Sequence, residues 1–296
     1  MIFKGSMVAL VTPFKNGTVD DGGLRRLIEF QIANGTDVLC PCGTTGESAT
    51  LSLEEHERVI QITIESAGGR VPVMAGSGSN NTEEAIRLTR HAKKAGATGC
   101  LLITPYYNRP TQQGLYLHFE KIAAAVDIPI VLYNVPGRTG VNMLPETVER
   151  LAKIPAIVGI KEASGSLEQV SQIINRCGGE FAVISGDDAN TLPMLAVGGV
   201  GGISVTANIA PGLCASMIRA AERGDWLEAR RIHHRLLPLH GAMFLQTNPI
   251  PVKTAVGMMG LASGDVRLPL CPMPEDLSEK LRAVLLSYEL IHSQKG

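Results

Sequence analysis

Residues 156–163 read AIVGIKEA, and this stretch decides how the whole chain is interpreted. Its first five residues are apolar without polar alternation, which is typical of a strand buried on both faces. Seven similar runs recur at intervals of roughly 20–35 residues. They cover residues 7–14, 37–43, 71–77, 99–106, 129–135, 181–187 and 201–206.

Amphipathic stretches between these runs predict helices. In residues 52–69, Ser52 stands at an N-cap position and Glu55 follows three residues later, the pattern of a capping box. Eight strand–helix units in series favour a closed (β/α)8 TIM barrel. An open doubly wound sheet is the main competitor, but GSGSNN at 76–81 lacks the third glycine of a nucleotide-binding fingerprint.

Two helical stretches near the C-terminus, residues 226–244 and 274–291, exceed what eight units need. We therefore divide the chain into a barrel over residues 1–224 and a C-terminal helical extension over residues 225–296. The extension either packs beside the barrel or builds a subunit contact.

Composition limits the possible functions. The chain has 296 residues, 45% of them hydrophobic, and a net charge of -1, which argues against a nucleic-acid partner. No apolar run reaches the ~18 residues of a membrane span. The first 14 residues resemble a strand more than a signal peptide, so we expect a cytoplasmic protein.

Metal and cofactor sites are not predicted. Cys40 and Cys42 lack a second Cys or His pair at ligand spacing. Six of the seven histidines fall in helical stretches, away from the predicted strand ends; they are His56, His91, His118, His233, His234 and His240.

Polar residues gather at the predicted strand ends, where TIM barrels carry their active sites. The segments are GTTGE (43–47), TPYYNRP (104–110), YNVPGRTG (133–140), KEAS (161–164) and SGDD (185–188). We expect their side chains to meet at one mouth of the barrel.

Lys161 ends the stretch quoted above and has two interpretations. Burial can lower a lysine pKa by several units and yield an amine that forms a Schiff base with a carbonyl substrate. The alternative is a structural ion pair with Glu162 or Asp187, although Glu162 should point to the opposite face of the strand.

Three other features at the predicted strand ends also have two interpretations each. Tyr133 could relay protons, or pack with its hydroxyl on a backbone group. Residues 43–45 could hold a carboxylate through backbone N–H groups and hydroxyls, or form a simple turn. Arg138 could grip a second carboxylate, or be an exposed loop arginine.

These strand ends resemble the class I aldolase family that contains N-acetylneuraminate lyase and dihydrodipicolinate synthase. The resemblance covers essentially the whole chain and rests on the strand-end motifs together with GIKEASG (159–165) and NPIPVK (248–253). The synthase branch is the better match, because the lyase branch typically has GSTGE and lacks the arginine found here at Arg138. Another pyruvate aldolase and a non-catalytic sugar-acid sensor are the alternatives.

The resemblance implies a reaction between pyruvate and L-aspartate 4-semialdehyde on the lysine and diaminopimelate route. It implies Lys161 as the Schiff-base lysine, Tyr133 as the proton donor and acceptor, and Thr44 and Tyr107 as relay partners. It assigns pyruvate contacts to Thr45 and to the Ile203 backbone, a place in the pocket wall to Gly186, and the semialdehyde carboxylate to Arg138. The resemblance also implies that Tyr107 reaches into an adjacent subunit of a homotetramer built as a dimer of dimers.

The resemblance also implies feedback inhibition by L-lysine at a dimer interface. The matching residues are Ser48, Ala49, His56, Asn80, Glu84 and Tyr106. Leu53 departs from the pattern, since sensitive enzymes often have histidine there, so we expect weaker inhibition. Alternatively, Asn80 and Glu84 belong to an ordinary helix start capped by Asn81 or Thr82.

Overall fold

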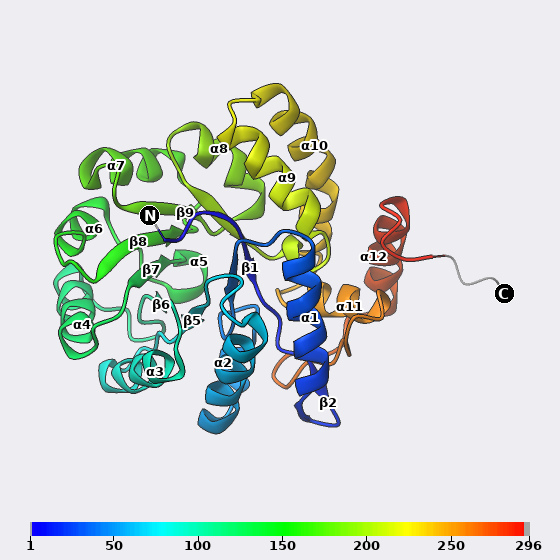
Figure 1. The fold of residues 1–296 in the computed structure, drawn as a ribbon, viewed down its shortest axis with the longest axis horizontal. Helices are drawn as coiled ribbons and strands as arrows, with labels where there is room; N and C mark the ends of the chain where they lie inside the picture. The colour runs from blue at the N-terminus through cyan, green and yellow to red at the C-terminus, as the bar shows by residue number, and fades with distance from the viewer. Residues whose placement is uncertain (1, 293–296) are drawn as a thin grey trace.

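The computed structural model describes residues 2–292 and forms a barrel of parallel strands surrounded by helices (Figure 1). The barrel strands are β1 (Gly5–Ala9), β4 (Val38–Cys40), β5 (Met74–Gly76), β6 (Gly99–Ile103), β7 (Ile130–Asn134), β8 (Ile157–Glu162), β9 (Ala182–Ser185) and β10 (Gly201–Ser204). Each lies within one of the eight apolar runs, apart from the first two residues of β1. The predicted TIM barrel is confirmed.

The strands pair in the order β4-β1-β10-β9-β8-β7-β6-β5. The ring closes between β4 and the start of β5, where Leu39 and Val73 form a parallel bridge and the Gly76 N–H donates to the Pro41 carbonyl at 2.9 Å. A two-stranded hairpin, β2 (Phe14–Lys15) and β3 (Thr18–Val19), follows β1.

Helices cover the outside of the barrel. The helices that follow successive strands are α1 (Asp21–Ala33), α2 (Leu53–Ala67), α3 (Thr82–Ala95), α4 (Gln112–Ala125), α6 (Pro145–Leu151), α7 (Leu167–Cys177), α8 (Thr191–Ala196) and α9 (Pro211–Glu222). A short helix, α5 (Pro136–Thr139), precedes α6. Side-chain caps begin several of these helices: Ser52 and Glu55 form the predicted capping box, and Asn81 rather than Thr82 caps α3.

The strands bury side chains on both faces, as the unbroken apolar runs predict. On β6, Leu101 belongs to the cluster inside the barrel, whereas Cys100 and Leu102 belong to the layer beneath the helices. This alternation places successive residues of one strand in two different cores.

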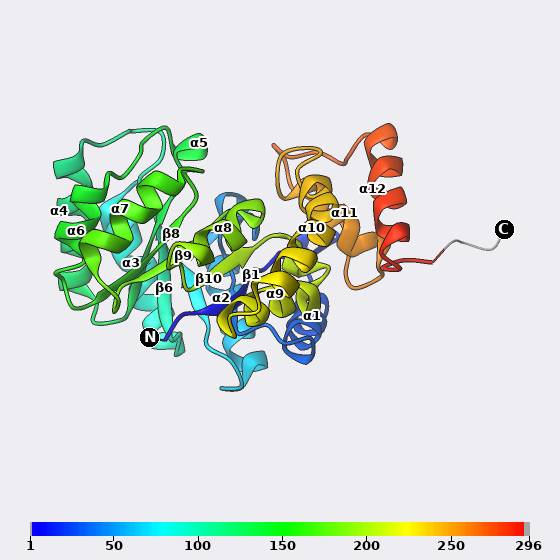
Figure 2. The same cartoon turned by 90° about the horizontal axis from the view of Figure 1, so that it is seen from above.

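Three helices lie beyond the eight units: α10 (Trp226–Ala242), α11 (Ile250–Met258) and α12 (Glu275–Ser287). Figure 2 shows them on one side of the barrel, with α12 outermost. The α10 helix packs against α9, and α12 packs against α10 and α11. Helix α11, which begins at Ile250 within the NPIPVK segment (248–253), is absent from the sequence-based interpretation. The boundary at residue 224 stays a prediction.

Within residues 2–292, no helix has the length and apolarity needed to cross a membrane.

Candidate active site

Lys161 lies near the C-terminal end of β8, buried at 6% exposure. It pairs in register with Tyr133 on β7, and its Nζ lies 4.3 Å from the centroid of the Tyr133 ring. The Tyr133 hydroxyl has no hydrogen-bond partner among the described residues, so the packed-on-backbone alternative is not what the structure contains. The amine of Lys161 therefore lies beside an aromatic ring that carries a free phenol.

The ion-pair alternative for Lys161 is also not what the structure contains. Glu162 accepts hydrogen bonds from Asn134 Nδ2 at 3.0 Å and Gln169 Nε2 at 3.1 Å, on the outer side of the strand. Asp187 accepts from Asn190 Nδ2 at 2.7 Å. Across residues 2–292, Lys161 forms no ion pair with either carboxylate.

Lys161 and Cys40 are both buried in the barrel. Cys40 lies near enough for the lysine charge to act on its thiol, yet burial raises the pKa of Cys40 to about 12. Burial raises the thiol pKa of Cys42 as well. Both thiols are therefore protonated at neutral pH, which makes them unsuited to act as nucleophiles.

Gly186 makes room for the lysine. A Cβ at position 186 would lie 2.9 Å from Lys161 Cε and 2.8 Å from the Ala163 Cβ. Contacts this short force a shift, so only glycine allows the observed path of the lysine side chain.

If Lys161 captures pyruvate, as the resemblance implies, the variant Gly186→Ala is expected to slow that capture roughly 10- to 100-fold, because the added methyl displaces the amine. The measurement is the rate of borohydride-trapped adduct at limiting pyruvate. Gly179→Ala is the matched control, since a Cβ there meets nothing within 4 Å. Equal rates in the two variants would refute the steric role of Gly186.

The loop after β4 brings Thr44 and Thr45 to the barrel mouth. Thr45 is 2% exposed, and its Oγ1 accepts a hydrogen bond from Asn248 Nδ2 at 3.0 Å. The backbone carbonyl of Asn248 accepts from Arg138 Nη2 at 3.2 Å. Asn248 thus connects the two predicted carboxylate-binding residues. The sequence signal for Asn248 is the NPIPVK segment (248–253), whose first residue is this asparagine.

A cavity of about 510 Å³ opens at this mouth, and Thr44, Tyr133 and Arg138 line one part of it. Lys161, Thr45, Gly186 and Ile203 lie outside its wall. Tyr133 is the residue that both lines the cavity and contacts Lys161. Arg138 is exposed on its short helix, yet it faces this shared space.

The predicted lysine-binding residues line another part of the same cavity. They are Ser48, Ala49, His56, Glu84 and Tyr106, together with Leu53. Asn80 is not in the wall, but its Nδ2 donates to the Tyr106 carbonyl at 3.1 Å. Burial lowers the pKa of His56 to about 4, so this imidazole is neutral at pH 7.

Tyr107 is the one predicted catalytic residue that stands apart. Its side chain is 91% exposed, and its backbone φ of 72° lies in the left-handed region that non-glycine residues seldom adopt. Asn108 holds the turn by donating from its backbone N–H to the Tyr106 carbonyl at 2.9 Å and from Nδ2 to the Asn80 carbonyl at 2.9 Å. Within one chain, Tyr107 does not line the cavity.

Nowhere in residues 2–292 do three or more His, Cys, Asp or Glu side chains gather in a group that could hold a metal ion.

Comparison with known proteins assigns this chain to a family. Residues 2–287 match the model of the dihydrodipicolinate synthetase family, which is nearly the whole chain. The chain belongs to the dihydrodipicolinate synthetase family. Membership in the synthetase family confirms the predicted resemblance and the prediction of an enzyme of the class I aldolase type.

Individual relatives agree with this membership. The chain is 59% identical over 290 residues to the 4-hydroxy-tetrahydrodipicolinate synthase of Syntrophus aciditrophicus, covering 98% of this chain and 100% of the relative. It is 47% identical, with a TM-score of 0.96, to a chloride-inhibited dihydrodipicolinate synthase of Acinetobacter baumannii complexed with pyruvate, covering 98% and 100% of the two chains. It is 43% identical, with a TM-score of 0.95, to the Cyanidioschyzon merolae enzyme with lysine bound, covering 98% and 99%.

Proposed function

We propose that the chain condenses pyruvate with L-aspartate 4-semialdehyde to form 4-hydroxy-tetrahydrodipicolinate in lysine and diaminopimelate biosynthesis. The observation that carries this proposal is Lys161, a buried lysine without a carboxylate partner among the described residues, beside the free phenol of Tyr133. The full-length identity of 59% to a synthase of this name supports it. No cofactor is needed, because the lysine amine supplies the electrophilic activation.

The reaction begins on Lys161. Its amine attacks the carbonyl carbon of pyruvate, water leaves, and an imine forms. Loss of a proton from the methyl carbon, through Tyr133, gives an enamine. The enamine carbon attacks the semialdehyde carbonyl, whose oxygen becomes the hydroxyl of the product. The amine of the second substrate then attacks the imine carbon, which closes the ring and releases Lys161.

Two carboxylates need two binding points. Thr45 and Ile203 are both buried, and we assign Thr45 and the Ile203 backbone to pyruvate, with Thr44 as the relay partner of Tyr133. Arg138 lies in the cavity wall above them, and we assign it to the semialdehyde carboxylate. Asn248 joins these two assigned regions by bonding both Thr45 and Arg138.

Borohydride trapping tests the proposal. The protein is incubated with pyruvate and borohydride, and its mass is measured before and after digestion. We expect one reduced pyruvate adduct per chain, located on Lys161. An unmodified Lys161 would refute every Schiff-base mechanism for this chain.

Another pyruvate aldolase of the same fold is the second candidate, and it differs in the acceptor. Turnover with aspartate semialdehyde is compared with turnover of sugar aldehydes and of N-acetylneuraminate. We expect the semialdehyde to be preferred, because Arg138 offers a cation to its carboxylate. Preference for a sugar acceptor would select the second candidate.

We propose that the active assembly is a homotetramer built as a dimer of dimers, in which Tyr107 serves the neighbouring site. Its 91% exposure and its strained, hydrogen-bonded turn support a residue held outward for a partner. Tyr107→Phe alone is expected to lower kcat about 100-fold through loss of a proton relay.

Mixed assemblies test this arrangement. Co-expression of Tyr107→Phe with Lys161→Ala chains is expected to restore activity, because each mixed dimer holds one site with an intact lysine and an intact partner tyrosine. Additive activities of the two inactive proteins would refute the shared site.

We propose that L-lysine binds in the part of the cavity lined by Ser48, His56 and Glu84. The carboxylate of Glu84 suits an ammonium group, and a relative solved with lysine bound supports the assignment. Glu84→Gln is expected to raise the lysine concentration for half-inhibition about tenfold, as loss of one charged contact does. Asp127→Asn, an exposed carboxylate outside the cavity lining, is the control.

A further inference from the structure

The C-terminal extension contributes a fully buried lysine to the loop that follows β4. Lys253 on α11 is 0% exposed, and its Nζ donates to Glu47 Oε1 at 2.5 Å. Burial lowers the pKa of Lys253 to about 8, although Glu47 and Asp265 favour its charged form. A buried ion pair contributes little net stability, because both charges lose their hydration. Its presence beside the active-site loop therefore needs another explanation.

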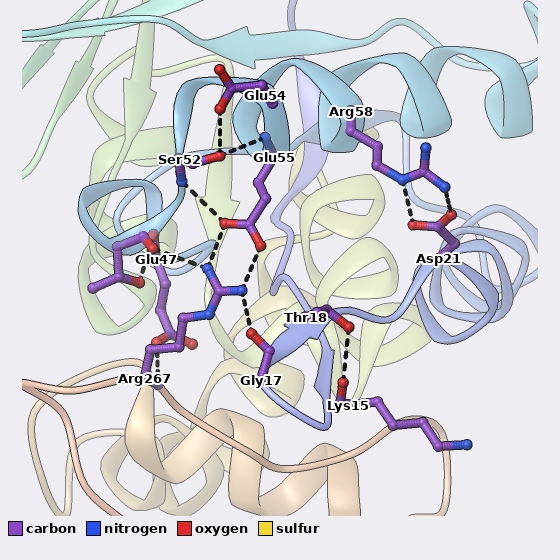
Figure 3. A network of polar contacts seen from close by, with 11 residues as sticks. Lys15, Gly17, Thr18, Asp21, Glu47, Ser52, Glu54, Glu55, Arg58 and Arg267 are labelled. Atoms are coloured by element: carbon purple, nitrogen blue, oxygen red, sulfur yellow. Dashed lines mark hydrogen bonds and ion pairs between the residues drawn. The ribbon is translucent and has the colours of Figure 1, made fainter.

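The C-terminal extension forms a second hydrogen bond with the Glu47 carboxylate. Its other oxygen, Oε2, accepts the backbone N–H of Arg267 at 3.2 Å. Figure 3 shows the Arg267 guanidinium beside Glu55, to which it donates twice at 2.6 Å. Both cations also lie over the ring of Phe14, with Lys253 Nζ at 4.0 Å and the Arg267 guanidinium carbon at 4.1 Å from its centroid. The extension thus holds Glu47 through two donors at once.

Glu47 in turn ends the tight turn that presents Thr44 and Thr45. Its backbone has a φ of 53°, in the left-handed region, and its N–H donates to the Thr44 carbonyl at 3.1 Å. The same turn is held at Thr45 by Asn248, which lies just before α11. The segment 248–253 therefore contacts the turn at two points: Asn248 donates to the Thr45 hydroxyl, and Lys253 donates to the Glu47 carboxylate.

We propose that Lys253 is a positioning residue that, through its ion pair with Glu47, holds the turn containing Thr44 and Thr45 in the geometry that receives the pyruvate carboxylate. The inference rests on the proposed function, since the pyruvate contact of Thr45 is part of it. Lys253 touches no reacting atom. Without its cation, the Glu47 carboxylate loses a charged partner inside the protein, and the backbone of the turn must move to bring it to water.

Lys253→Met tests this role, because methionine fills the space without a charge. We expect the KM for pyruvate to rise about tenfold, while kcat at saturating pyruvate changes less than about twofold. Glu47→Gln is expected to change KM in the same direction, since glutamine keeps only one of the two acceptor oxygens. This second variant decides the question if Lys253→Met does not fold.

A stability control separates positioning from general loosening of the extension. Leu285→Ala on α12 removes a buried side chain from the same extension and is expected to lower the melting temperature without changing the pyruvate KM. An unchanged pyruvate KM in both Lys253→Met and Glu47→Gln would overturn the proposal, as would an equal rise in Leu285→Ala. Failure of the unmodified protein to trap pyruvate would instead contradict the proposed function, so the two failures are distinguishable.

Discussion

Lys161→Met is expected to lose turnover by on the order of 10⁴-fold or more, because it removes the group that forms the covalent intermediate. Trapping of pyruvate by borohydride should disappear completely. The fold should survive, since methionine has nearly the shape of lysine and no carboxylate among residues 2–292 pairs with Lys161. Melting temperature should stay level or rise, because a buried amine is replaced by an apolar side chain.

Activity, adduct mass and melting temperature measured on one preparation check this prediction. Lys4→Met is the matched control, because Lys4 is exposed and precedes the N-terminal end of β1, whereas the candidate site lies at the C-terminal strand ends. A Lys161→Met protein that still incorporates pyruvate would place the Schiff base elsewhere. A large drop in melting temperature would indicate a structural role that the ion-pair pattern does not suggest.

Arg138→Ala is expected to lower kcat/KM for aspartate semialdehyde about 100-fold, the usual cost of removing a charged hydrogen-bonding partner from a carboxylate. Pyruvate trapping on Lys161 should survive, because Arg138 lies in the cavity wall and not among the buried residues around Lys161. Steady-state kinetics with each substrate varied in turn, together with trapping, separate the two effects.

Arg138→Lys provides the conservative comparison. It keeps the charge but loses the planar fork, so we expect an intermediate loss for the semialdehyde. Loss of trapping in Arg138→Ala would remove the assignment of this residue to the second substrate. It would instead point to the link from Arg138 through Asn248 to Thr45 as a requirement for pyruvate binding.

The local patterns in the sequence are sufficient to predict the barrel. Continuous apolar runs predict strands covered on both faces, and the structure places every barrel strand in or at the edge of such a run. The capping box of Ser52 and Glu55 forms as predicted, because its partners are three residues apart and depend on little else. The family motifs at the strand ends identify the candidate residues. Two of these residues, Lys161 and Tyr133, lie side by side in the structure.

Contacts between residues far apart in the sequence cannot be predicted from local patterns in this way. Asn248 and Thr45 are 203 residues apart, and Lys253 and Glu47 are 206 apart, so no periodicity or spacing connects them. Helix α11 was missed because two prolines in NPIPVK indicate a loop when only local propensity is considered.

By itself, the sequence determined the order of strands and helices, the family, and the chemistry available at the strand ends, because each of these depends on residues close together in the chain. Only the tertiary structure decided that Lys161 has no carboxylate partner within the described residues, that Tyr107 points outward, and that the extension grips the Thr44–Thr45 turn. Those outcomes depend on which side chains share a buried space, and packing and desolvation act there between residues that the sequence keeps far apart.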